Sequence, residues 1–142
     1  MPHAGLIDTG AILAIVDVED EWHSACVQAL SSLPSPLLTS EAVLTETFHL
    51  VGSRSHNIEQ VWNFVRSGAV ALQPIADSEL PEVRALMARY HDRPMDFADA
   101  TLVHLANRES VSLILTIDHD DFETYRIAGR KRFSILPHRS RT

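Results

Sequence analysis

The sequence has almost no cysteine, since Cys26 is the single one among 142 residues. This excludes an internal disulfide and also a metal cluster held by several thiolates. We therefore expect a reducing compartment, the cytoplasm, and we expect Cys26 to be a small core residue of a helix.

Cationic residues are also scarce, with 12 Lys and Arg against 19 Asp and Glu and a formal net charge of −7. An acidic chain does not attract nucleic acid through its overall charge, so such binding requires a local basic surface or a bridging cation. Six of the twelve cations fall in the last seventeen positions: Arg126, Arg130, Lys131, Arg132, Arg139 and Arg141. This segment is either a solvated basic tail or a local binding patch, and the sequence supports both interpretations equally.

No apolar run is long enough to cross a membrane. The stretch 4–18 is interrupted by Asp8 and Asp17, and no basic segment precedes it. We therefore expect no signal peptide and no membrane segment. Repeats, low-complexity tracts and linkers are absent from the sequence as well. The length and the 45% of apolar residues favour one domain spanning residues 1–142.

Short apolar runs alternate with amphipathic segments, which is typical of an α/β fold with a central parallel sheet of four to five strands. Strands are predicted at residues 6–7, 37–39, 70–72, 113–117 and 133–136. Helices are predicted at residues 10–16, 20–33, 41–51, 58–65, 79–90 and 96–109. Ser40 is the expected N-cap of the third helix, and Gly52 is its expected end.

Two acidic residues directly follow predicted strands. Asp8 ends the run Gly5-Leu6-Ile7, and Asp118 ends the fourth strand. In open parallel sheets, ligands bind beyond the carboxyl ends of the strands, near the point where the strand order reverses. If the first and fourth strands are neighbours there, the carboxylates of Asp8 and Asp118 face each other.

Two further acids lie on helices that could reach the same edge of the sheet. Asp99 is in the first turn of the last predicted helix, and Glu46 is in the middle of the third. Carboxylates that are brought together repel and raise one another's pKa values. A divalent cation such as Mg²⁺ or Mn²⁺ relieves this repulsion, because both ions prefer oxygen ligands. The four acids Asp8, Glu46, Asp99 and Asp118 therefore predict a metal-dependent catalytic site.

Each acid taken alone has a structural alternative. Asp96 fits the N-cap of the helix that carries Asp99. Asp118 could merely begin a turn in Asp-His-Asp-Asp, and Glu46 in isolation is more simply a solvated helix residue. Asp8 is the hardest to dismiss, because it follows a buried strand. The inference of a cation site therefore rests on the set.

Hydroxyl and imidazole side chains near these acids are less informative. Thr9 and Thr116 either orient a carboxylate or make ordinary local hydrogen bonds. The eight histidines show no ligand spacing such as His-Glu-x-x-His. His119 is expected to be a surface turn residue, and His104 a core or boundary residue.

Four segments stand out when they are taken in order along the chain. They are Leu6-Ile7-Asp8-Thr9-Gly10-Ala11-Ile12-Leu13-Ala14, Glu41-Ala42-Val43-Leu44-Thr45-Glu46, Met95-Asp96-Phe97-Ala98-Asp99-Ala100-Thr101-Leu102-Val103 and Leu115-Thr116-Ile117-Asp118-His119-Asp120-Asp121-Phe122. In residues and order they resemble the motifs of the PIN domain, and within it those of the VapC-like toxins of bacterial toxin–antitoxin modules. The resemblance covers essentially the whole chain. It departs at Gly10, where the family often has a small polar residue.

This resemblance implies both a fold and an activity. The implied fold is a three-layer α/β/α sandwich around a parallel sheet. The implied activity is hydrolysis of RNA phosphodiester bonds with Mg²⁺ or Mn²⁺, in a homodimer that an antitoxin silences by covering its acidic groove. The residue roles implied are metal ligation by Asp8, Glu46, Asp99 and Asp118, an auxiliary acid at Asp96 and a supporting hydroxyl at Thr116.

Other classes of protein also place an aspartate after the first strand. A haloacid-dehalogenase-type phosphotransferase requires a second aspartate two residues later, where this chain has Gly10. A response-regulator receiver domain requires a lysine after a late strand, whereas Lys131, the only lysine, lies in a basic run. A non-catalytic binding module with a PIN fold is the third alternative, and the intact acids argue against it.

Overall fold

A five-stranded parallel sheet forms the centre of the molecule. In the computed structural model, which describes residues 5–52, 55–93 and 95–139, the strand order is β3-β2-β1-β4-β7. The strands are β1 (Leu6–Ile7), β2 (Leu37–Thr39), β3 (Val70–Leu72), β4 (Leu113–Leu115) and β7 (Ser134–Leu136). Each neighbouring pair is parallel, so the predicted sheet type is confirmed.

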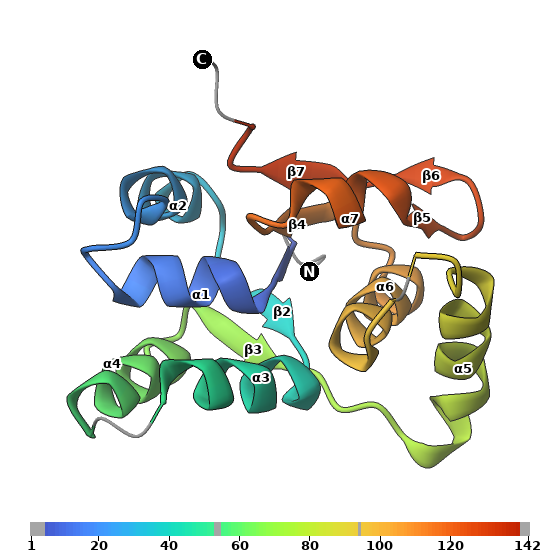
Figure 1. Cartoon of the computed structure of the whole chain (residues 1–142), viewed down its shortest axis with the longest axis horizontal. Coiled ribbons are helices and arrows are strands. Elements are labelled where there is room, and N and C mark those ends of the chain that lie inside the picture. Colours follow the sequence, from blue (N-terminus) through green and yellow to red (C-terminus); the bar gives the residue numbers. More distant parts are fainter. Residues whose placement is uncertain (1–4, 53–54, 94, 140–142) are drawn as a thin grey trace.

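Helices cover both faces of this sheet. They are α1 (Thr9–Val16), α2 (His23–Ser31), α3 (Glu41–Val51), α4 (Ser55–Val65), α5 (Leu80–Arg89), α6 (Phe97–Glu109) and α7 (His119–Thr124), with a 3₁₀ turn at Asp77–Glu79. Figure 1 shows α1 to α4 gathered on the left of the sheet and α5 and α6 on the right. This division follows from right-handed crossovers, because the chain crosses the sheet first in one direction and then in the other. The predicted three-layer α/β/α sandwich is confirmed.

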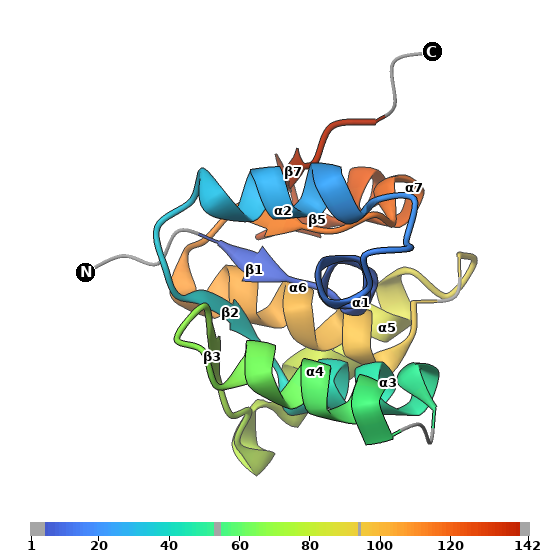
Figure 2. The same cartoon turned by 90° about the vertical axis from the view of Figure 1, so that its left-hand side faces the viewer.

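The strand order reverses between β1 and β4. From β1 the chain proceeds outward to β2 and β3, and it then returns to β4 and β7 on the other side. Leu6 lies opposite both Leu38 and Ile114, and the backbone N–H of Asp8 donates to the carbonyl of Leu115 at 3.0 Å. Figure 2 shows β1 running directly into α1 at this edge. The first and fourth strands are therefore neighbours, as the proposed site requires.

The core lies on both faces of the central strands. Leu6, Ile7, Leu38, Ile114 and Leu115 are completely buried, and burying one such side chain contributes roughly 1.5–3 kcal/mol. This packing fixes the strand ends from which the acidic residues project. None of the helices within the described ranges is long and apolar enough to span a bilayer.

Two predicted helices differ in detail from the structure. The second helix begins at His23, three residues later than predicted, because the carboxylate of Asp20 accepts a hydrogen bond from the backbone N–H of Trp22 at 2.8 Å. This bond holds the chain in a turn before the helix. Helix α4 begins at Ser55, three residues earlier than predicted; on it, Trp62 is 45% exposed and packs against Phe48, with ring centroids 4.9 Å apart.

Helix α7 and a small antiparallel hairpin, β5 (Arg126–Ile127) with β6 (Lys131–Arg132), were not predicted. The residues before Phe122 have turn propensity, but Phe122 is buried in the core and its N–H donates to the carbonyl of Asp118 at 3.2 Å. Tertiary packing therefore makes a helix of this segment. The hairpin strands have two residues each, too few for an alternating pattern. Pro94 and Arg141 lie outside the described residues.

Candidate active site

Asp8 occupies the carboxyl end of β1 and is fixed there by two hydrogen bonds. Its Oδ1 accepts from the backbone N–H of Thr9 at 2.7 Å, which makes Asp8 the N-cap of α1. Its Oδ2 accepts from the hydroxyl of Thr116 at 3.0 Å. The Thr116 oxygen in turn accepts from the backbone N–H of Asp118 at 3.0 Å. One buried hydroxyl thus connects the ends of β1 and β4.

Thr9 contributes to the site through its backbone. Its hydroxyl points away from the carboxylates and donates to the carbonyl of Val43 at 3.2 Å, within hydrogen-bond distance of the Thr47 hydroxyl at 3.4 Å. These contacts tie α1 to α3. Of the two hydroxyl residues singled out in the sequence, Thr116 is the one whose side chain touches a carboxylate.

Asp99 is buried in the first turn of α6. The helix begins there because Oδ1 of Asp96 accepts from the backbone N–H of Asp99 at 2.8 Å, which confirms the predicted N-cap. The Oδ2 of Asp99 accepts from the hydroxyl of Tyr125 at 2.9 Å. Tyr125 is itself fully buried and packs edge-on against Phe122. The orientation of the Asp99 carboxylate is therefore set by the core.

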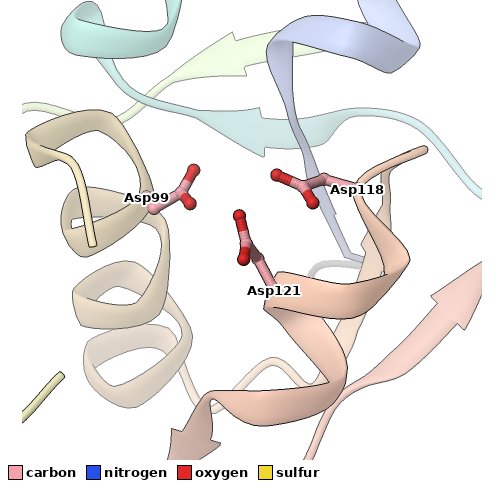
Figure 3. Close-up of side chains that lie close together, drawn as sticks. All are labelled: Asp99, Asp118 and Asp121. Atoms are coloured by element: carbon pink, nitrogen blue, oxygen red, sulfur yellow. The ribbon is translucent and has the colours of Figure 1, made fainter. Parts of the chain in front are cut away.

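Three carboxylates converge in front of the sheet edge. Asp99, Asp118 and Asp121 each offer an oxygen within 4.8 Å of the others, and Figure 3 shows the three side chains pointing toward one another from α6, from the start of α7 and from its first turn. Asp121 was not predicted as a site residue. The spacing Asp118-x-x-Asp121 would have indicated it, because residues three apart share a helix face, but this segment was interpreted as a turn.

Glu46 and Asp96 lie at the border of this group. The side chain of Glu46 is half-buried on α3, and that of Asp96 is exposed. Both charges act on Asp8, whose pKa they help to raise. Among the described residues, the tightest cluster consists of Asp99, Asp118 and Asp121, and neither Glu46 nor Asp96 belongs to it.

The raised pKa values of Asp8, Asp99 and Asp118 show that their surroundings disfavour the charged carboxylate form. Burial, together with the charges of Glu46 and Asp96, raises the pKa of Asp8 to about 6. Burial and the charges of Asp8 and Asp96 raise the pKa of Asp99 to about 8. Burial and the neighbouring Asp121 carboxylate raise the pKa of Asp118 to about 7. Near neutral pH the cluster either holds protons or requires a positive partner.

A hard divalent cation fits this donor set. The converging atoms are all carboxylate oxygens, which Mg²⁺ and Mn²⁺ prefer over the softer transition metals. Asp8, Asp99, Asp118 and Asp121 are the residues that could hold it. A bound cation would offset the burial and the mutual repulsion that raise the pKa values of Asp8, Asp99 and Asp118.

The structure also tests what the sequence suggested for His119, Gly10 and His104. His119 is buried, so the expectation of a surface turn residue is wrong; its Nε2 lies 2.8 Å from the carbonyl of Pro137 and its ring packs against Trp22. Steric crowding explains the glycine at position 10, since a Cβ there would lie 2.7 Å from Cγ1 of Ile117. His104 is a buried residue, as predicted.

The fold and the acidic edge define an α/β protein of the PIN class. The sequence profile described as "PIN domain" matches residues 5–128, and the chain belongs to this family. The haloacid-dehalogenase and receiver alternatives are thereby excluded, and the resemblance found in the sequence is confirmed.

One relative is a VapC protein, and two solved structures share the fold. The chain is 31% identical over 134 residues to Ribonuclease VapC26 of Mycobacterium tuberculosis, covering 93% of this chain and 99% of that protein. The crystal structure of M. tuberculosis VapC20, described as a sarcin-ricin loop cleaving toxin, superposes with a TM-score of 0.73 at 20% identity, over 82% of this chain and 92% of that one. VapBC2 from Rickettsia felis, solved with a promoter DNA fragment, gives a TM-score of 0.66 at 12% identity, over 93% and 98% of the two chains.

Proposed function

We propose that this protein is a Mg²⁺- or Mn²⁺-dependent endoribonuclease and the toxin of a toxin–antitoxin pair. The observation that carries the proposal is the convergence of the Asp99, Asp118 and Asp121 carboxylates beside the buried Asp8 at the reversal point of the sheet, where the pKa values of Asp8, Asp99 and Asp118 are raised. The similarity to a protein named Ribonuclease VapC26 supports RNA as the substrate.

Each acid has a distinct place in the proposed mechanism. Asp8, Asp99, Asp118 and Asp121 hold the cation, while Glu46 and Asp96 flank it. Thr116 keeps Asp8 and the backbone of Asp118 in register, and Tyr125 orients Asp99. A divalent cation supplies charge neutralisation at the phosphate and activation of water, so that hydrolysis needs no nucleophilic side chain.

The proposal includes protein partners. VapBC2 is a toxin–antitoxin assembly by name, and we propose an antitoxin that covers the acidic edge of this chain. Phe97, which is 48% exposed beside Asp96, offers an apolar contact there. Homodimerisation and a cytoplasmic location are further parts of the proposal, and the exposed Trp62 is a candidate contact between protomers.

The test is cleavage of RNA by the purified protein. We expect cleavage of single-stranded or structured RNA with Mn²⁺ and none with EDTA. Asp99→Asn and Asp118→Asn should each lower the rate by at least about 100-fold, the upper end of the loss seen when groups that merely support metal ligands are removed. Asp77→Asn, at an exposed acid in the 3₁₀ turn, is the matched control and should keep the rate. If no RNA is cleaved, or if all three variants behave alike, the proposal is wrong. Mn²⁺ binding without cleavage would identify a binding module.

A further inference from the structure

An acidic nuclease has an electrostatic problem, because its polyanionic substrate must approach a cluster of carboxylates. The chain carries a net charge of −7, and the approaching phosphates need a local cationic surface. Such a surface lies on the last residue of α5, on the turn after it and on the β5–β6 hairpin. We call it the basic rim; its residues are Arg89, Arg93, Arg130, Lys131 and Arg132.

Arg93 is the member that touches the acidic cluster. Its Nε donates to Oδ1 of Asp121 at 3.0 Å, and its side chain remains 45% exposed. Within the described ranges, its two terminal nitrogens make no hydrogen bond to protein. The backbone N–H of Arg93 donates to the carbonyl of Tyr90 at 3.1 Å, which fixes the turn. A guanidinium tethered through Nε presents its remaining N–H groups as a fork, the geometry that binds two phosphate oxygens.

The hairpin supplies three more cations without internal partners. Arg130, Lys131 and Arg132 are exposed, and none of them takes part in an ion pair with any residue of the described ranges. Two other basic residues of the same region differ. Arg126 donates to the carbonyls of Glu123 and Thr124, and Arg139 pairs with Asp120 and Glu123. Among the described cations from Arg126 to Arg139, those without an ion pair or a side-chain hydrogen bond are therefore Arg130 in the turn and Lys131 and Arg132 in β6.

The hairpin is held in place next to α5 and α6. The backbone N–H of Ala128 donates to the side-chain oxygen of Asn107 at 2.6 Å, and the guanidinium of Arg89 lies 4.0 Å from the position that a Cβ on Gly129 would occupy. The N–H of Arg126 donates to the hydroxyl of Tyr90 at 2.9 Å. The turn after α5 and the hairpin therefore form one surface.

This surface begins at the acids. Strand β5 starts immediately after Tyr125, whose hydroxyl donates to Asp99, and the antiparallel pairing of the hairpin sets Arg132 opposite Arg126, the first residue of β5. We propose that the basic rim binds the phosphate backbone of RNA on one side of the bond to be cleaved, with Arg93 contacting the phosphate nearest the acids. This inference rests on the proposed function. In this proposal the fixed hairpin binds the RNA phosphates, whereas Arg126 and Arg139 stabilise the fold.

The test separates binding from cleavage. The triple variant Arg130→Gln/Lys131→Gln/Arg132→Gln and the single variant Arg93→Gln are compared with Arg66→Gln, an exposed arginine that follows α4. A short fluorescent single-stranded RNA serves as substrate with Mn²⁺. Fluorescence anisotropy of the same RNA is measured on each variant combined with Asp118→Asn, which prevents cleavage. Circular dichroism checks that all variants are folded.

We expect the triple variant to raise KM about tenfold or more at 50 mM salt, with kcat retained within about twofold. The dependence of log affinity on log salt should become shallower by about 2, since each lost contact to single-stranded nucleic acid removes about 0.7. Arg93→Gln should remove about one such contact. Arg93→Lys, which retains the charge without the fork, should recover part of the affinity.

The basic rim and the nuclease activity can be refuted separately, each by a different outcome. If RNA is cleaved but the triple variant and Arg66→Gln have the same KM and salt dependence, the basic rim is wrong and the nuclease proposal stands. If wild-type protein binds RNA with the expected salt dependence through the rim but cleaves none, the nuclease proposal is wrong and the rim stands.

Discussion

Replacing Asp99 with asparagine should make the cation-free protein more stable at neutral pH. Asp99 is buried, and its pKa in the folded protein is about 8, against an ordinary value of 3.8. A carboxyl with a raised pKa favours the folded state while it is protonated. Its contribution is complete below the unfolded pKa and is lost as the pH rises from about 4 to about 8. Asparagine is neutral throughout, so the variant avoids this loss.

The size of the effect follows from the pKa difference. Each pH unit above 3.8 changes the free energy of unfolding by about 1.4 kcal/mol until the folded pKa is reached, which gives about 4 kcal/mol at pH 7. The charges of Asp8 and Asp96 supply part of this, and the pKa of Asp8 is itself raised. We therefore expect a difference of about 2–4 kcal/mol. The amide oxygen of asparagine can still accept the hydrogen bond from Tyr125.

The assay is urea unfolding in EDTA at several values between about pH 4.5 and pH 8. The free energy of unfolding of Asp99→Asn minus that of the wild type should be small at the acidic end and should increase toward pH 8. Asp77→Asn should show no such trend. With Mn²⁺ the order should reverse, because the wild type gains ligand-binding energy that the variant lacks. A variant that is less stable than the wild type at every pH, or a difference that does not change with pH, would refute the reasoning.

Two further predictions concern the groups that hold the acids. Thr116→Val removes the hydroxyl that donates to Asp8 and accepts from the N–H of Asp118. We expect a loss of about 1–2 kcal/mol in the free energy of unfolding and a roughly 10–100-fold lower cleavage rate. Unchanged cleavage would contradict the role assigned to Thr116. Tyr125→Phe removes the donor to Asp99, a bond that lowers the pKa of Asp99. The pKa of Asp99 should therefore rise further, and calorimetry near pH 6.5 should show weaker Mn²⁺ binding; equal affinity would sink the prediction.

The strand ends could be predicted because local pattern and global topology agree there. Asp8 and Asp118 follow apolar runs that become β1 and β4, and the rule that ligands bind where strand order reverses brought them together. Asp99 was predicted from its place in the first turn of the last helix and from the resemblance to the PIN motifs, whereas Asp96 has the spacing of the N-cap. The prediction of each of these three residues depends on the pattern of the few residues around it in the sequence.

Other features depend on contacts that are distant in the sequence. Asp121 reaches the cluster only because Phe122 is drawn into the core and converts a turn-like segment into α7. His119, the first residue of α7, is buried because its ring packs against Trp22, the N-cap residue of α2. The β5–β6 hairpin depends on anchoring by Asn107. Local propensity contains no record of such contacts, and tertiary packing overrides it.

The central claim is that acids from separate elements form one cation site. Crystals of the wild-type protein grown or soaked with Mn²⁺ should show an anomalous difference peak enclosed by Asp8, Asp99, Asp118 and Asp121, and Asp99→Asn crystals treated in the same way should lose or weaken it. A structure in which these carboxylates remain without Mn²⁺ at saturating concentration, or in which Mn²⁺ binds only elsewhere, would contradict the claim.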